Sequence, residues 1–386
     1  MISPDHTWKS VFQGPRQRPL EWLAERMIFL VSLSAIIVVF LILAFVAREA
    51  APILLGRINT VQGQKVITVA ELDKHTDEEL CAYLGLTKRQ FDEMSPDTRL
   101  LMVEAKAEAA DQMSGDKDAA VNATTWRYLL GPYQWTDYDK PEYIWQPVSR
   151  IPKYNLVPLV VGSLKATLVA LLFSVPLALA AALYVSQLAS PRVKEWLKPA
   201  IEMLGGIPSV VMGFFALIVM ASALQWIFGY DSRLNVFVAG LALGLAVIPV
   251  VFSIAEDALT SVPRSYTHAA LALGASRWQT AWQIVLPAAL PGVFAAVVLG
   301  FGRAIGETMI VLMASGNASI LSWRFFDSAR TLTATIAAEL AETVVGGTHY
   351  RVLFLIGALL FAVTFVSNLI GDVVICRLKG RLEGKA

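Results

Sequence analysis

Six long apolar runs constrain this chain more than any other feature of its sequence. They lie at about residues 27–47, 158–187, 201–228, 235–255, 288–315 and 350–376. A helix needs about 20 predominantly apolar residues to cross the hydrocarbon core of a bilayer, and each run reaches that length. Charged residues make up only 16% of the chain, whereas a soluble protein carries about 25%. We therefore predict an all-α polytopic membrane bundle of six transmembrane helices.

The basic residues between these runs predict the orientation of the bundle. They follow the second, fourth and sixth runs, at Arg192, Lys194, Lys198, Arg264, Arg277, Arg377, Lys379, Arg381 and Lys385. Connections rich in Lys and Arg stay in the cytoplasm. We therefore expect both termini to be cytoplasmic. Cys81 and Cys376 then lie on opposite sides of the membrane and cannot pair.

The composition changes along the chain divide it into five parts. We predict a cytoplasmic N-terminal segment (1–26), a first transmembrane helix (27–47), an external insertion (48–157), a membrane core (158–378) with a polar loop (256–287), and a cytoplasmic tail (379–386). The first run ends without a small-residue cleavage site, which favours a retained helix over a signal peptide. The insertion is charged and of mixed sign, and its role is open.

The polar loop at 256–287 contains residues that favour the starts and ends of two short helices. Pro263 suits a first helical turn, and Gly274 suits the left-handed residue that ends a helix. We expect a second helix to reach Ile284 and to end at Leu286-Pro287. The small side chains between Pro263 and Gly274 allow close packing. The residues alone are equally compatible with a surface that docks a partner and with a loop that rests on the protein's own helices.

Two opposite charges, Arg303 and Glu307, lie inside the fifth run. They are four residues apart, which predicts that they share one face of a helix. Charges at this depth are costly, and they usually face a bundle interior or a polar path. A guanidinium group suits a tetrahedral oxyanion such as phosphate, and Glu307 could hold it in place. The alternative is a structural ion pair that locks two helices together.

Signatures of catalysis and of metal binding are missing from the sequence. No Gly-x-x-x-x-Gly-Lys-[Ser/Thr] loop occurs, and the tail from Gly380 to Lys385 has the wrong spacing for one. The four histidines lie far apart and do not have the spacing of metal ligands. We expect a protein that is no enzyme and that holds no metal or cofactor itself.

The polar loop resembles the EAA loop of bacterial ABC importer permeases. The resemblance rests on the spacing of Ala269-Ala270, Gly274, Ile284 and Leu286-Pro287. It implies a coupling helix that sits in a groove of an ATPase subunit. The coupling residues are then His268, Ala269, Ala270, Gly274, Ile284, Leu286 and Pro287. His268 stands where that family usually has Glu, so a salt bridge from this position is not implied.

Three further stretches narrow the resemblance to the phosphate-specific ABC permeases. They run from Gly206 to Phe215, from Gly302 to Met309 and from Thr333 to Glu339. The Gly-Glu-Thr-Met form is similar to the PstC-type subunit, whereas the PstA type usually has Gly-Glu-x-Ala-Pro. The likeness covers roughly residues 156–378. It implies that Arg303, Glu307 and Thr308 lie along the path of inorganic phosphate in an ATP-driven importer.

The resemblance also implies the partners and the location of this chain. A second permease subunit of the PstA type, a cytoplasmic ATPase dimer that binds ATP and Mg, and an external phosphate-binding protein would complete the transporter in a bacterial inner membrane. No nucleic acid is expected. Three alternatives remain: a permease for sulfate or molybdate, a secondary transporter, and a membrane-anchored sensor whose segment 48–157 binds a ligand.

Overall fold

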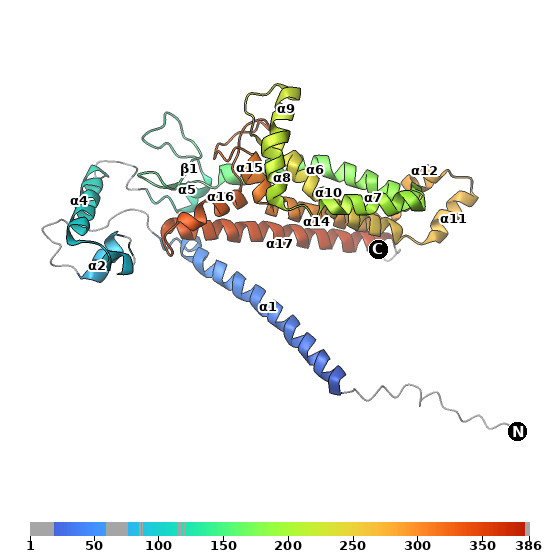
Figure 1. Cartoon of the computed structure of the whole chain (residues 1–386), viewed down its shortest axis with the longest axis horizontal. Helices are drawn as coiled ribbons and strands as arrows, with labels where there is room; N and C mark the ends of the chain where they lie inside the picture. The colour runs from blue at the N-terminus through green and yellow to red at the C-terminus, as the bar shows by residue number, and fades with distance from the viewer. Residues whose placement is uncertain are drawn as a thin grey trace.

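The fold is a long bundle of helices (Figure 1). The computed structural model describes residues 19–58, 76–84, 86, 88–113, 118 and 121–382. Five helices within these ranges are long and apolar enough to cross a membrane, and a pair bent by 72° makes a sixth if it is one span. The described residues form one sheet, which has two strands. The predicted all-α membrane bundle is confirmed.

The bundle is built from α1 and from the helices that follow residue 156. These are α1 (Pro19–Leu54), α6 (Val157–Leu183), η4 (Tyr184–Leu188), α7 (Pro191–Leu204), α8 (Ser209–Phe215), η5 (Ala216–Met220), α9 (Ala221–Phe228), α10 (Val236–Thr260), α11 (Arg264–Ala272), α12 (Arg277–Thr280), η6 (Ala281–Val285), α13 (Leu286–Ala288), α14 (Leu290–Gly306), α15 (Met309–Ala314), α16 (Leu332–Glu339), η7 (Leu340–Glu342) and α17 (Thr348–Leu382).

Helix α10 is the centre of the bundle, and α6, α7 and α14 pack around it. Small residues allow the closest approaches. A Cβ atom added at Gly240 would lie 2.5 Å from the Cβ of Val169 on α6, and one at Gly300 of α14 would lie 2.6 Å from Val251. Helices in membranes associate through such small residues because backbones can then approach closely.

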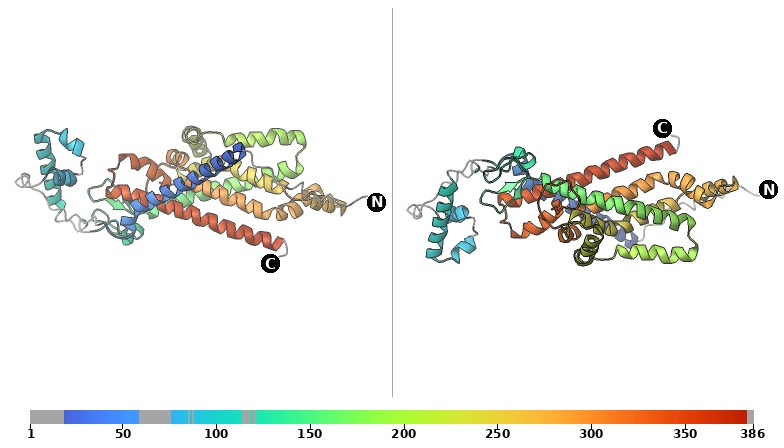
Figure 2. Two further views of the ribbon diagram at one scale, coloured as in Figure 1. Left: turned by 90° about the horizontal axis from the view of Figure 1, so that it is seen from below. Right: turned by 90° about the horizontal axis from the view of Figure 1, so that it is seen from above.

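The bundle has two ends, which we name by the helices found there. At the α11 end lie α11, α12 and the C-terminal end of α17, and at the α16 end lie α16, α5 and the sheet (Figure 1). Helices α8 and α9 run across the long axis of the bundle, as the views in Figures 1 and 2 agree. Helix α1 contacts α17 near the α16 end, where Phe45 meets Phe354 with ring centroids 5.4 Å apart.

The predicted continuous run at 201–228 is wrong, because it holds parts of two helices. Helix α7 ends at Leu204, and α8 begins at Ser209. Pro208 between them has no N–H to donate to a helix, and Gly205-Gly206 before it is a weak helix former. The chain therefore turns here, and only Ser209–Phe228 is long and apolar enough to be a span.

The first part of the segment between α1 and α6 holds three helices. These are α2 (Asp77–Leu84), α3 (Lys88–Asp92) and α4 (Pro96–Met113). They pack around a core of four buried side chains, Leu80, Cys81, Phe91 and Val103. Cys81 is therefore buried in this small core, while Cys376 is exposed on α17, and both are free.

Residues 121–156 form the second part of this segment, and they share a core with the bundle. They contain α5 (Trp126–Leu130) and the antiparallel strands β1 (Trp145–Gln146) and β2 (Lys153–Tyr154). Their buried side chains join those of α1, α6, α16 and α17 in one cluster, which we call the α16-end core. It consists of Ala50, Ile53, Ala123, Leu129, Trp135, Ile144, Trp145, Tyr154, Leu156, Leu159, Leu332, Val352, Leu353, Leu355 and Ile356.

Replacing Gly240 tests the close packing of α10 on α6. We expect Gly240→Ala to lower the stability by about 1–3 kcal/mol, because the new methyl group has no room beside Val169. Gly357→Ala is the matched control, since its Cβ would meet its nearest neighbour only at 4.0 Å. Thermal unfolding of the two variants in detergent measures the difference. Equal melting temperatures would contradict the packing described here.

Candidate functional site

Arg303 lies in the last turn of α14, which is one of the apolar helices of the bundle. Its side chain is exposed, and within the described ranges it makes no hydrogen bond or ion pair. A charged side chain at membrane depth normally faces a polar path or a partner. The guanidinium group of Arg303 is therefore available to a group from outside this chain.

The predicted ion pair between Arg303 and Glu307 is wrong. Helix α14 ends at Gly306, and Glu307 is its C-cap with an extended backbone (φ −71°, ψ 135°). A spacing of four residues brings two side chains to one face only while the helix continues. The Glu307 carboxylate instead accepts a hydrogen bond from the backbone N–H of Thr308 at 3.2 Å.

The break after Gly306 also corrects the predicted continuous run at 288–315. Thr308 is the N-cap of α15, and its hydroxyl group donates to the carbonyl oxygen of Gly306 at 3.5 Å. The hydroxyl group of Thr333 on α16 donates to the Glu307 carbonyl oxygen at 2.8 Å. Thr308 and Glu307 thus form a half-buried kink beside Arg303, held by a third helix.

The predicted coupling segment forms a helical hairpin at the α11 end (Figure 1). Helix α11 has Pro263 as its N-cap, and Gly274 follows it with φ +88°, as the sequence predicts. Ser276 and Gln279 then form a capping box for α12. His268 and Ala269 are exposed, whereas Ala270 is buried against the second arm of the hairpin.

The second arm does not end at Leu286-Pro287 as predicted. Helical structure continues through α12, η6 and α13 to Ala288, and the chain then bends by 72° into α14. Pro287 lies inside this continuous stretch, where its missing N–H removes one helical hydrogen bond shortly before the bend. Ile284 and Pro287 are exposed, and Leu286 is half-buried.

Large apolar side chains project from this hairpin. Leu273 is 91% exposed, and Trp278 and Trp282 are 57% and 54% exposed. The two indole rings stack with centroids 6.0 Å apart and an angle of 16° between their planes. An exposed aromatic patch at the tip of a helical hairpin is typical of a protein–protein contact. We call the residues Tyr266, Leu273, Trp278 and Trp282 the tip patch.

A buried carboxylate joins α7 to α10 near the hairpin. Glu256 is 1% exposed, and its two oxygens accept hydrogen bonds from Lys194 and Lys198, each at 2.7 Å. Thr260 donates to the same carboxylate at 3.0 Å. Glu256 therefore fixes α7 along α10.

A second charged network holds the α16 end together. The Glu339 carboxylate pairs with Arg330 and with His349, whose Nε2 atom lies 3.0 Å away. The indole N–H of Trp145 donates to it at 3.1 Å. Burial raises the pKa of the neighbouring Tyr154, and the charge of Glu339 adds to the effect. The network thus ties the C-terminal end of α16 to β1 and to the first turn of α17.

Lys165 is a further charged residue that the sequence reasoning missed. It lies on α6 and is buried, and its ammonium group donates to the backbone oxygens of Ser322 and Arg324 at 2.6 and 2.9 Å. It therefore holds the loop between α15 and α16 against the bundle. A lysine within an apolar run was the signal that could have marked it.

Comparisons with known proteins identify the family of this chain. A family described as binding-protein-dependent transport system inner membrane component matches residues 174–380. This is more than half of the chain, and the chain belongs to that family. With its apolar helices, it is a multi-pass protein of the inner membrane.

Several individual proteins are similar to this chain. The chain is similar to a probable ABC transporter permease protein, YqgH, of Bacillus subtilis, with 35% identity over 58% of this chain and 73% of the relative. It is 31% identical to the phosphate transport system permease protein PstC of Pasteurella multocida, over 62% of this chain and 80% of that one. An inward-facing MetNI methionine ABC transporter chain matches at 21% identity, with a TM-score of 0.47, and the match covers 58% of this chain and 95% of that chain.

Neutralising Glu256 tests its role between α7 and α10. We expect Glu256→Gln to lower the stability by about 3–5 kcal/mol, because two ammonium groups then face each other without their shared partner. Asp257→Asn is the matched control, since that side chain is 75% exposed. Thermal unfolding in detergent compares the variants. A melting temperature for Glu256→Gln as high as that of Asp257→Asn would contradict this account.

Proposed function

We propose that this chain is the transmembrane subunit of an ATP-driven importer of inorganic phosphate. The observation that carries the proposal is Arg303, an exposed guanidinium group without an internal partner on a membrane helix. A guanidinium fork matches the geometry of phosphate oxygens. Several of the similar proteins are named as phosphate transport permeases of the PstC type, which supports phosphate as the anion.

The proposed transporter needs further subunits, because this chain has no phosphate-binding loop for ATP. A second permease of the PstA type would pair with this chain, and an external phosphate-binding protein would deliver the anion. A cytoplasmic ATPase dimer would bind ATP and Mg and would contact the tip patch. Closure of the dimer would then move α11, and the 72° bend into α14 would pass this movement towards Arg303.

Substitution of Arg303 tests the proposed function. With the complete transporter in proteoliposomes, we expect Arg303→Gln to lower ATP-driven phosphate uptake by about 10- to 100-fold, as loss of a charge-assisted hydrogen bond predicts. Arg303→Lys should keep part of the activity, since it keeps the charge but not the fork. Expression should stay normal in both variants because Arg303 has no partner within the described part of the chain.

Two controls accompany this experiment. Glu307→Gln should not rescue Arg303→Gln, because no ion pair joins these two described residues. Replacing phosphate by sulfate or molybdate tests the alternative substrates. Normal phosphate uptake by Arg303→Gln would overturn the proposal, and faster uptake of sulfate or molybdate than of phosphate would replace phosphate as the substrate.

Gly274 tests the proposed coupling helix. Its φ of +88° disfavours a β-branched residue, while a Cβ atom at this position would meet nothing within 4 Å. Gly274→Val should therefore add about 1–3 kcal/mol of backbone strain at the turn. We expect phosphate uptake to fall while the protein still inserts and ATP hydrolysis continues. Gly274→Asn should be mild, since Asn tolerates this backbone region, and equal uptake by both variants would leave the turn without a role in coupling.

The proposed orientation places the α11 end and both termini in the cytoplasm. In a chain with Cys81→Ala and Cys376→Ser, we expect a cysteine at Val148 to react with an impermeant thiol reagent outside intact cells. A cysteine at Leu273 should react only after lysis. The chain is expressed without the ATPase subunits, so that both side chains are exposed and access is matched. Labelling of the Leu273 position in intact cells would reverse the orientation.

A further inference from the structure

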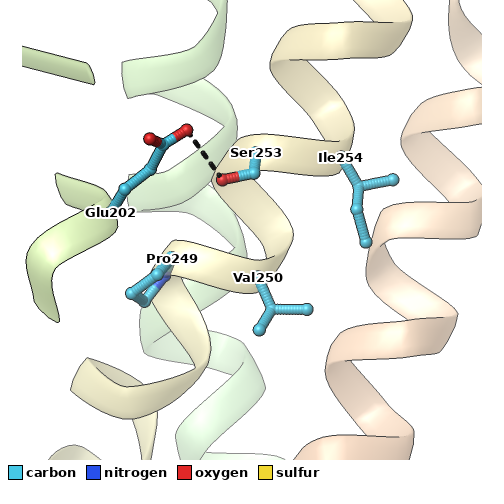
Figure 3. A pocket seen from close by; sticks show the side chains of 5 residues that line it. All are labelled: Glu202, Pro249, Val250, Ser253 and Ile254. Carbon is cyan, nitrogen blue, oxygen red and sulfur yellow. Dashed lines mark hydrogen bonds between the residues drawn. The ribbon is translucent and has the colours of Figure 1, made fainter. Parts of the chain in front are cut away.

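An open cavity of about 310 Å³ lies between α7 and α10 (Figure 3). It is lined by Glu202, Pro249, Val250, Ser253 and Ile254. The hydroxyl group of Ser253 donates to the Glu202 carboxylate at 3.5 Å, across the rim of the cavity. The other three side chains are apolar, so Glu202 supplies the charge of this cavity.

The cavity lies on the side of α10 between its contacts with α7 and with α14. Pro249 of α10 packs against Gly205 of α7, and Val247 and Val251 of α10 pack against Gly300 of α14. With about 100° per residue, these two contacts lie on opposite sides of α10. Val250 and Ile254 point between them, to a side that neither neighbour covers. We call this side, with the facing edges of α7 and α14, the open face.

Glu202 and Arg303 project towards this same open face. Both flanking helices run antiparallel to α10, because Lys194 of α7 reaches Glu256, and Gly292 of α14 lies against Ala258. Glu202 is three residues before the contact at Gly205, and Arg303 is three residues after the contact at Gly300. Each is therefore turned by about 60° from its contact, and the two rotations lead to the same side of α10.

The two charges differ in depth. Glu202 lies level with Ser253, whereas Arg303 lies one turn beyond Gly300, towards the α16 end. With a rise of about 1.5 Å per residue, this places Glu202 roughly 10 Å closer to the α11 end than Arg303. A solute that passes Arg303 along the open face towards the α11 end meets Glu202 next.

Glu202 makes no ion pair within 4 Å in the described residues, although the charge of Lys198 acts on it from one turn away on α7. The ammonium group of Lys198 is bound to Glu256 at 2.7 Å and lies 3.6 Å from Asp257. A carboxylate at this depth therefore remains exposed to the cavity. Ionisable groups inside a membrane are costly, and they mark paths of substrates or ions.

The chemistry of a carboxylate decides what this cavity can hold. An ionised carboxylate only accepts hydrogen bonds, so it repels a bare oxyanion and binds one that carries a proton. Phosphate and arsenate carry at least one proton near neutral pH, whereas sulfate carries none. A site that accepts a hydrogen bond from a substrate O–H favours that substrate over the analogue that lacks it. The negative charge of the exposed Glu202 carboxylate also repels an anion that has no proton to offer.

We propose that Glu202, held by Ser253, forms a second oxyanion subsite that selects protonated oxyanions on their way past Arg303. This inference rests on the proposed function, and it assigns the specificity of the path to a residue other than Arg303. Arg303 attracts any oxyanion of suitable size. Glu202 accepts the proton-bearing oxygen of phosphate, and it disfavours sulfate.

Equilibrium dialysis tests this subsite on the complete transporter in detergent, without its external binding protein. Radiolabelled phosphate and sulfate are the probes, with arsenate as a competitor. We expect the unmodified transporter to prefer phosphate over sulfate by about tenfold or more, as one hydrogen bond to a charged group provides. Arsenate should displace the phosphate.

Glu202→Gln should abolish this preference by weakening phosphate binding and not sulfate binding. Glu202→Asp should retain a preference, which separates loss of the carboxylate from a folding defect. Glu195→Gln is the matched control, because it removes the same charge from an exposed position of α7 outside the cavity. It should leave the preference unchanged.

The outcomes separate this inference from the proposed function. Arg303→Gln should weaken the binding of both phosphate and sulfate. Unchanged binding of the two anions would count against the function proposed for Arg303. The subsite is overturned if Glu202→Gln keeps the phosphate preference, or if it weakens phosphate and sulfate equally. It is also overturned if the unmodified transporter does not discriminate between the two anions.

Discussion

Hydrocarbon offers no hydrogen-bond partner to a backbone group that leaves a helix, and this constraint governs where the chain can bend. The kink after α14 meets it through a neighbour, since the Thr333 hydroxyl group donates to the carbonyl oxygen of Glu307 at 2.8 Å. The turn after α7 meets it through Pro208, which has no N–H to satisfy, and through tight turns at Gly205 and Gly206. The helices that contain these two breaks, α7 and α14, pack on either side of α10. The open face of α10 therefore lies between two breaks whose backbone groups are satisfied.

The charges of the bundle divide into two kinds according to their partners. Glu256, Glu339 and Lys165 are buried or half-buried, and each bonds to groups on another helix or loop. They fix α7, the α16 end and the loop before α16. Arg303 and Glu202 lie on the open face, and neither forms a direct ion pair among the described residues. The bonded charges thus hold the helices of the bundle in place, while the two charges on the open face remain available to bind a solute.

The sequence predicted the helical bundle well and the geometry of its charges poorly. Long apolar runs report spanning helices directly, and Pro263 and Gly274 mark the ends of α11 because each has a strong local backbone preference. The Arg303–Glu307 pair failed because a spacing rule assumes a continuous helix, and the helix ends at Gly306. Glu202 was missed because its place depends on the antiparallel packing of α7 on α10, which no local pattern encodes. The adjacent Gly205-Gly206-Ile207-Pro208 was the available signal that a membrane helix breaks beside a carboxylate.

The α16-end core has a consequence for how the protein is made. It joins Ala50 and Ile53 of the first helix to Val352 and Ile356 of the last one, with Trp145 and Tyr154 between them. During synthesis the first helix leaves the ribosome long before α17 exists, so this core cannot form until the final helix has entered the bilayer. Until then, the aromatic side chains of residues 121–156 lack much of their packing surface. Completion of the last helix is therefore the step that closes this core and commits the nascent chain to its final structure.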